Sequence, residues 1–363
     1  MVHRLKALST AALFSVLAVF APLEHAHAQA GGRLYVVEGV PIDVTAKSAV
    51  EARDQALTEG QREAFKRLME RLTPAGSTPP GASDSEIEGM VQGFQIRDER
   101  ASGVRYLANL VVQFRPAAVQ SFLSRRNVAA VVSAAPAVLI VPVLAEEGGA
   151  RLWEDPNPWR EAWEQAPLGQ TIVPITVPLG DARDLTGITA EQAMAGDEAA
   201  LTTLAQRYGA SSSVVAVARL GGTETQPAVN IQVNQIGGMP GPAIAETLAA
   251  EPGETREALL NRAISRISND LDRDWKQQAT IQPGMENTLT VTVPLTGLED
   301  WMTVRRRLSG LPIVRKQTVK SLSRSEATLD IGYAGTTDQL RSALEQRNLA
   351  LSEDATGWRL AAR

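Results

Sequence analysis

The sequence contains no cysteine, and its three histidines, His3, His25 and His27, all lie at the extreme N-terminus. Ser-His-Asp and Cys-His catalytic arrangements therefore cannot be built from the remainder of the protein. The usual protein ligands of zinc and of haem iron are missing from it for the same reason. Without cysteine, no disulfide contributes to stability, which must come from ordinary hydrophobic cores.

Motifs for phosphates and metal ions are also missing. No Gly-rich loop leads into Lys-Ser/Thr, no G-x-G-x-x-G opens a helix, and no EF-hand spacing occurs. We therefore predict no cofactor and no metal. Lys47-Ser48 and Lys320-Ser321 are neighbours in sequence, but adjacent side chains on a strand or helix point apart, so neither pair predicts a Ser-Lys dyad.

The charge balance argues against a nucleic-acid partner. The protein has 36 Lys and Arg against 41 Asp and Glu, a formal net charge of −5, and both signs are well mixed. The short basic runs at 125–126 and 305–307 fall near the C-terminal ends of predicted helices. Positive charge is favourable there because it complements the helix dipole, so these runs predict no anionic partner.

The N-terminus has the pattern of a secretory signal peptide. Arg4 and Lys6 precede an apolar run from Ala7 to Pro22, and Ala26-His27-Ala28 supplies an A-x-A cleavage site. The run is short for a transmembrane helix, no cysteine follows it for lipid attachment, and no second apolar stretch reaches membrane-spanning length. We expect cleavage after Ala28 and a mature periplasmic protein that begins at Gln29 and has neither His nor Cys. Peripheral association with a membrane stays open.

Hydrophobic periodicity divides the rest of the sequence into three small units of mixed α/β and α+β class. The first, 31–127, has the order β-α-α-β-β-α, which predicts a small sheet covered by helices on one face. The second, 136–280, contains the continuous apolar strand Val138–Leu144, a strand at 172–177, one helix over 190–207, three further strands and a long amphipathic helix. A small-residue link, 129–136, separates the two units.

The third unit, 282–363, has the clearest pattern. Alternating apolar residues and capped helices follow one another in the order β-α-β-β-α-β, which is the ferredoxin-like arrangement.

The mature protein resembles a family of exported proteobacterial proteins known as domain of unknown function 2066. The resemblance lies in the opening strand at Val37-Glu38-Gly39-Val40 with its Ala-rich helix, in the strand Val138–Leu144, in the segment 152–163 (LWEDPNPWREAW) and in the segment 204–210 (LAQRYGA). It implies an envelope protein without an assigned activity, and so it transfers no catalytic residues to this protein. The second unit is also similar in element order to the N-terminal α/β domains of envelope assembly proteins.

The segment 152–163 is the most distinctive feature of the sequence. Its candidate binding residues are Trp153, Asp155, Asn157, Trp159, Arg160 and Trp163, with Asp181 nearby in sequence. Flat indole rings with polar neighbours could recognise a glycan or a peptide. The alternative is that Trp159 and Trp163, four residues apart, pack a short helix onto the second sheet with Asn157 as its N-cap.

Carboxylates are the remaining catalytic residues in a protein without His and Cys. Glu146-Glu147, Glu154-Asp155 and Asp181/Asp184 fall in predicted loops of the second unit, where a suitably spaced pair could hydrolyse a glycosidic bond. Such pairs are common, however, and solvated loop charges or helix caps explain most of them. The leading hypothesis is therefore a non-enzymatic envelope protein that binds another envelope protein. The alternative is a carboxylate-dependent hydrolase or glycan-binding protein that uses the Trp-rich segment.

Overall fold

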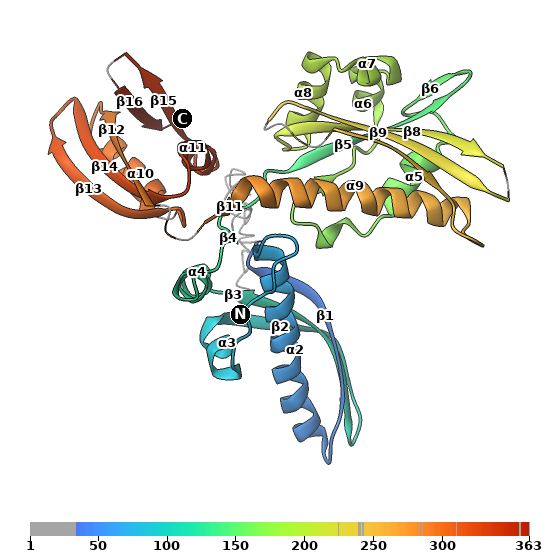
Figure 1. The fold of residues 1–363 in the computed structure, drawn as a ribbon, viewed down its shortest axis with the longest axis horizontal. Helices are drawn as coiled ribbons and strands as arrows, with labels where there is room; N and C mark the ends of the chain where they lie inside the picture. The colour runs from blue at the N-terminus through green and yellow to red at the C-terminus, as the bar shows by residue number, and fades with distance from the viewer. Residues whose placement is uncertain are drawn as a thin grey trace, which may run out of the picture.

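The computed structural model describes residues 34–362, apart from 224, 239, 240, 242, 283, 285, 310 and 356. The predicted signal peptide lies outside the described residues. Three units, each with its own sheet, meet at a central junction (Figure 1). This arrangement of helices with several small sheets confirms the predicted mixed α/β and α+β class. Among the described residues, no helix is long and apolar enough to cross a membrane.

The first unit is an antiparallel sheet with helices on one side (Figure 1). Its elements are β1 (Val36–Thr45), α2 (Ala49–Leu72), α3 (Asp84–Met90), β2 (Val91–Ala101), β3 (Arg105–Phe114) and α4 (Pro116–Arg125), and the strand order is β1-β3-β2. Helix α2 begins where the Ser48 hydroxyl accepts a hydrogen bond from the Glu51 amide. Small residues at four-residue spacing, Ala52, Ala56, Gly60 and Ala64, form its buried stripe and let the helix approach the sheet closely.

The second unit is built on a mixed sheet. Its strands are β5 (Val138–Glu146), β6 (Gly149–Arg151), β7 (Ile175–Thr176), β8 (Ser212–Gly222), β9 (Pro227–Ile236) and β10 (Ile244–Ala249), in the order β10-β9-β8-β5-β6, with β7 also beside β5. Strand β5 is buried over Val138–Ala145 and runs parallel to β8, as its continuous apolar sequence predicts.

Helices cover both faces of this second sheet. The short α5 (Pro158–Gln165) and the long α9 (Arg256–Ala279) pack against one face, while α6 (Ala182–Gly187), α7 (Ala190–Ala195) and α8 (Glu198–Arg207) cover the other. A short 3-10 turn, η1 (Leu168–Gln170), follows α5.

Two predictions for the second unit were wrong in detail. The single helix expected over 190–207 is two helices, because Gly196 adopts a left-handed conformation at the end of α7 and the Asp197 carboxylate caps α8. The strand expected over 172–177 is reduced to β7, since the Asp272 carboxylate instead accepts hydrogen bonds from the amides of Ile172 and Val173.

The third unit has the predicted ferredoxin-like order with one additional strand. Its elements are β12 (Glu286–Pro294), α10 (Leu298–Ser309), β13 (Val314–Leu322), β14 (Glu326–Ala334), α11 (Thr337–Glu345), β15 (Leu349–Asp354) and β16 (Gly357–Ala362). The sheet order is β13-β14-β12-β16-β15. The C-terminal β16 folds back as a hairpin and inserts between β12 and β15, pairing parallel with β12.

Two connecting segments join the units. Strand β4 (Ala130–Val131), in the segment expected to be only a link, pairs antiparallel with β11 (Thr280–Ile281), which follows α9. One continuous hydrophobic core runs from the first unit through α9 to the second sheet. The third unit has a separate core, to which Val132 and Ile281 of the connecting segments contribute. The first two units therefore share a core, whereas the third contacts them through the connecting segments, whose Val132 and Ile281 pack into its separate core.

Candidate functional site

The tryptophans of segment 152–163 differ in exposure. Trp159 and Trp163 on α5 are fully buried, with their rings edge to face and 5.7 Å apart. The Trp159 Nε1–H donates to the Ala216 carbonyl at 2.8 Å, which fixes α5 against β8. Trp153 is only partly buried, and its Nε1–H donates to the Ile188 carbonyl at 2.9 Å. Neither ring of α5 is exposed to a ligand in this structure.

The polar residues of the segment hold the segment itself together. The buried Asn157 caps α5 by accepting from the Arg160 amide at 3.0 Å, and its side-chain amide donates to the Leu152 carbonyl. The Arg160 guanidinium donates to the Trp153 carbonyl and to Asp155, at 2.9 and 2.8 Å. These bonds are local, between residues close in sequence, and they account for most of the predicted binding residues as parts of one loop and one helix start.

Asp181 belongs to a second polar cluster, at the start of α6. Its carboxylate caps the helix by accepting from the amides of Arg183 and Asp184, and it pairs with Arg207 of α8. The Arg207 hydrogen bond is the main cause that lowers the pKa of Asp181 from 3.8 to about 2. Asp184 is fully buried and accepts from Arg207 and from the Tyr208 hydroxyl. Arg207 and Tyr208 were not among the predicted binding residues, although they lie in the segment 204–210 and near the C-terminal end of a predicted helix.

The other carboxylates considered for hydrolysis are scattered over this unit. Glu146 forms an ion pair with Arg151 at 2.6 Å, and Glu154 accepts from the amides of Leu152 and Trp153. Glu147 lies in the exposed turn between β5 and β6. Among the described residues, no group of three or more acidic side chains is placed to hold a metal ion.

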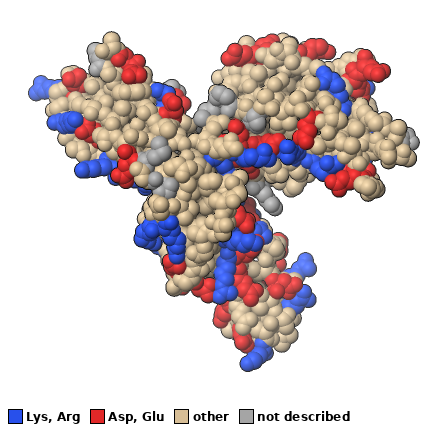
Figure 2. Space-filling model, in the orientation of Figure 1, with Lys and Arg blue, Asp and Glu red and all other residues tan. Residues whose placement is uncertain are grey.

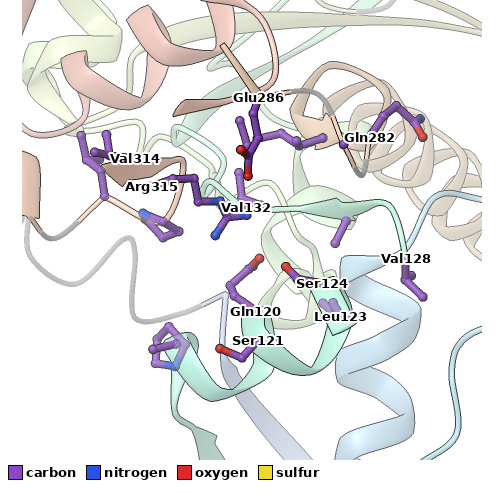
Figure 3. Close-up of a pocket in the computed structure, with 18 of the residues that line it drawn as sticks. Gln120, Ser121, Leu123, Ser124, Val128, Val132, Gln282, Glu286, Val314 and Arg315 are labelled. Atoms are coloured by element: carbon purple, nitrogen blue, oxygen red, sulfur yellow. The ribbon is translucent and has the colours of Figure 1, made fainter. Parts of the chain in front are cut away.

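A large cavity lies elsewhere, at the junction of the three units. It has a volume of about 710 Å³ and lies between α4 of the first unit, the β4–β11 connection and the start of the third unit (Figure 3). Its apolar lining includes Leu123, Val128, Val132, Leu311 and Val314. The size is within the range of ligand-binding pockets, and the mixture of apolar and polar lining is typical of them. We call it the junction cavity.

Polar side chains from distant parts of the sequence converge in the junction cavity. Gln120, Ser121 and Ser124 come from α4, Glu286 from β12 and Arg315 from β13. Figure 3 shows Arg315 extending toward Gln120, with the Ser124 hydroxyl directed at the same space. The cavity therefore presents amide, hydroxyl, carboxylate and guanidinium groups to one volume.

Arg315 is placed in the cavity by an irregularity in its strand. Val314 pairs with Tyr333, and Lys316 pairs with Gly332. Tyr333 and Gly332 are consecutive in β14, so Arg315 is an extra residue that has no partner of its own in that strand. Such a β-bulge interrupts the regular alternation of side chains and redirects the extra one. The guanidinium is thereby directed at α4 instead of following the pleat of β13.

Gln120 is fixed by a buried hydrogen bond beneath the cavity. Its side-chain amide donates to the Tyr35 hydroxyl at 2.6 Å, and only 6% of its surface is exposed. Burial raises the pKa of Tyr35 to about 12, while the Gln120 hydrogen bond and the nearby Arg315 charge oppose this shift. Tyr35 therefore remains a neutral phenol, and the Gln120 amide has one defined position in the cavity wall.

A smaller cavity of about 340 Å³ lies between the connecting segments and α11 of the third unit. It shares Val132 and Ile281 with the junction cavity. Between α9 and α11, the Gln339 side-chain amide donates to the carbonyls of Gln278 and Thr280, at 2.7 and 3.1 Å. The third unit thus contacts the others through a few residues of the connecting segments, and both cavities adjoin this contact.

A scan against protein-family models found no match for this protein, and a search of curated proteins found none. Among solved structures, it is similar to the lipoprotein GNA1162 from Neisseria meningitidis, with 17% sequence identity and a TM-score of 0.25. The similarity covers 37% of this protein and 94% of the lipoprotein. A similarity of this extent supports no conclusion about fold or function.

Proposed function

We propose that this protein is an exported, non-enzymatic component of the cell envelope that binds a protein partner in the periplasm through its junction cavity. The observation that carries the proposal is the cavity itself. Segments far apart in sequence bring polar side chains, among them Gln120, Glu286 and Arg315, to one space of ligand size. The carboxylates and tryptophans of the second unit, by contrast, are largely engaged in bonds within that unit.

The charge distribution on one face of the protein favours a protein partner over nucleic acid. Acidic and basic residues are interspersed over all three units on the face shown in Figure 2. Nucleic-acid binding instead requires a continuous basic face, because most of its affinity comes from neutralised phosphates.

The export and family assignments are part of the same proposal. The signal-peptide pattern before Gln29 supports a periplasmic location, and the segments at 37–40, 138–144, 152–163 and 204–210 support membership of the family known as domain of unknown function 2066. N-terminal sequencing of the protein from a periplasmic fraction tests the first assignment. A polypeptide that begins at Gln29 supports it, and one that retains Arg4 in the membrane fraction contradicts it.

Site-specific photocrosslinking in cells tests the binding function. A photoreactive amino acid replaces Ser121, which is exposed on α4 at the junction cavity, and in a control strain it replaces Ser265, which is exposed on α9 outside the cavity. We expect a discrete crosslinked partner from position 121 and none of that size from position 265. Absence of a partner at position 121 in the native envelope would remove the basis of the proposal.

A further inference from the structure

We propose that the junction cavity binds an acidic peptide segment, whose carboxylate pairs with Arg315. This inference rests on the proposed function, because it names the chemistry of the partner that the cavity receives. It is carried by four features of the cavity: an unpaired guanidinium, the bulge that directs it, the hydrogen-bonding groups around it and the free edge of β13.

The first feature is the charge of Arg315. Among the described lining residues it is the single cation, and no ion pair joins it to a carboxylate within the described part of the protein. Some arginines elsewhere are paired in the folded protein, for example Arg207 with Asp181 and Arg262 with Glu254, and their donors are already occupied. A guanidinium presents a planar fork of donors that matches a carboxylate. Arg315 is therefore available to an external carboxylate.

The second feature is the geometry that positions this side chain. The bulge between Val314 and Lys316 makes Arg315 the extra residue of β13, and its guanidinium points across the cavity toward α4 (Figure 3). β-Bulges are frequent next to functional sites, where they re-aim a side chain. In a regular strand without this bulge, the Arg315 side chain would follow the ordinary alternation of side chains between the two faces of the sheet.

The third feature is the set of neutral groups around the guanidinium. The Ser121 and Ser124 hydroxyls and the Gln120 side chain are hydrogen-bonding groups that suit the amides of a peptide. Gln120 is already fixed through its amide nitrogen by Tyr35, which leaves its carbonyl oxygen as an acceptor for a peptide N–H. Apolar lining residues such as Leu123 and Leu311 supply contact area for a side chain.

The fourth feature favours a peptide over other anions. Strand β13 is at the end of its sheet and pairs only with β14 among the described residues, so its outer backbone groups remain available for strand addition. Anionic lipid headgroups and nucleic acids are usually held by several cations. Here one arginine acts alone, and Glu286 lines the same cavity and repels a second negative charge. A peptide that places one carboxylate at Arg315 and a hydrogen-bond donor at Glu286 pairs with both charged residues of the cavity.

The test of this inference uses the strain that carries the photoreactive amino acid at position 121, together with the variants Arg315→Gln and Arg315→Lys of the full-length protein. Arg324→Gln is the matched control, because Arg324 lies in the exposed turn between β13 and β14 and removal of its charge leaves the cavity unchanged. Mass spectrometry identifies the crosslinked segment of the partner. That segment is then synthesised with its acidic group either intact or converted to an amide, and its binding to the purified protein is measured by fluorescence anisotropy.

We expect the crosslinked segment to contain Asp, Glu or a C-terminal carboxylate. Arg315→Gln is expected to weaken binding about tenfold, the usual order for a charge-assisted hydrogen bond. Arg315→Lys retains part of the affinity, Arg324→Gln retains all of it, and the amide peptide binds as weakly to the native protein as the acidic peptide binds to Arg315→Gln.

Two results would overturn the inference while the proposed function stands: unchanged binding in Arg315→Gln, or a crosslinked segment without an acidic group. A crosslink from position 121 that stays within the same molecule, or no crosslink there at all, would overturn both.

Discussion

Gly60 in the middle of α2 offers a sharp test of how closely the first helix packs on its sheet. A Cβ at this position would lie 2.4 Å from Leu110 Cδ1 and 2.9 Å from Ile42 Cγ2. Replacement of a helix-interior glycine by alanine normally stabilises a helix by about 1 kcal/mol. Overpacking of a close-packed core costs about 1–3 kcal/mol. Leu110 is fully buried, and protein cores are close-packed, so we expect the clash to outweigh the gain.

We therefore expect Gly60→Ala to destabilise the protein by up to about 2 kcal/mol, the overpacking cost less the gain in helix propensity. Because the first two units share one core, the corresponding fall in Tm is up to about 8 °C, at about 2–4 °C per kcal/mol for a unit of this size. Differential scanning calorimetry measures this fall, and hydrogen exchange of the α2 amides localises it.

Gly89→Ala is the matched control. Gly89 lies in α3, and a Cβ there would meet no atom within 4 Å. This substitution should leave Tm unchanged or raise it slightly, because only the gain in helix propensity applies. The double variant Gly60→Ala/Leu110→Val should lose less stability than the two single variants add up to, since the shorter side chain relieves the contact. A rise in Tm for Gly60→Ala, similar to that for Gly89→Ala, would refute the close packing of α2 on β3.

Three further predictions concern the second unit. Asn157→Ala should cost about 1–2 kcal/mol in a urea titration, because it removes both the cap of α5 and a buried hydrogen bond. Trp159→Phe should cost about 1–3 kcal/mol, because the Ala216 carbonyl loses its indole donor, and it should leave crosslinking at the junction cavity unchanged. The Arg262 hydrogen bond lowers the pKa of Glu254 from 4.5 to about 2, so this pair stabilises the fold above pH 4.5 and loses its contribution as the pH falls toward 2. Glu254→Gln should therefore lower Tm at pH 6 and make the fall of Tm between pH 4.5 and 2 less steep. If Tm depends on pH between 4.5 and 2 in the same way in the variant and the native protein, the Glu254–Arg262 pair does not make this contribution.

Much of the local structure could be read from the sequence. Helix starts at Ser48, Asn157 and Thr336 lie where capping residues precede an apolar period, and each side chain accepts the expected backbone hydrogen bond. The continuous apolar strand Val138–Leu144 is buried, as its composition requires. Such features depend on contacts between residues a few positions apart, which the sequence order itself specifies.

The break between α7 and α8 shows where prediction from the local sequence fails. The segment 190–207 has a helical period, and Gly196 followed by Asp197 is compatible with either one helix or two. The left-handed Gly196 and the cap at Asp197 are favoured once both helices pack on the second sheet. The place of β16 between β12 and β15 is similar, because strand order depends on which edges are free when the hairpin docks.

The sequence by itself determined the pattern of an export signal, the loss of histidine and cysteine chemistry beyond that signal, the mixed α/β class and most of the helices and strands. These properties follow from composition and from short-range periodicity. Only the tertiary structure decided that Trp159 and Trp163 are internal and that Gln120, Glu286 and Arg315 share a cavity. The positions of those residues depend on the β4–β11 ladder and on the bulge at Arg315 in β13. Neither feature leaves a pattern in the sequence, because each depends on pairing between segments that lie far apart in it.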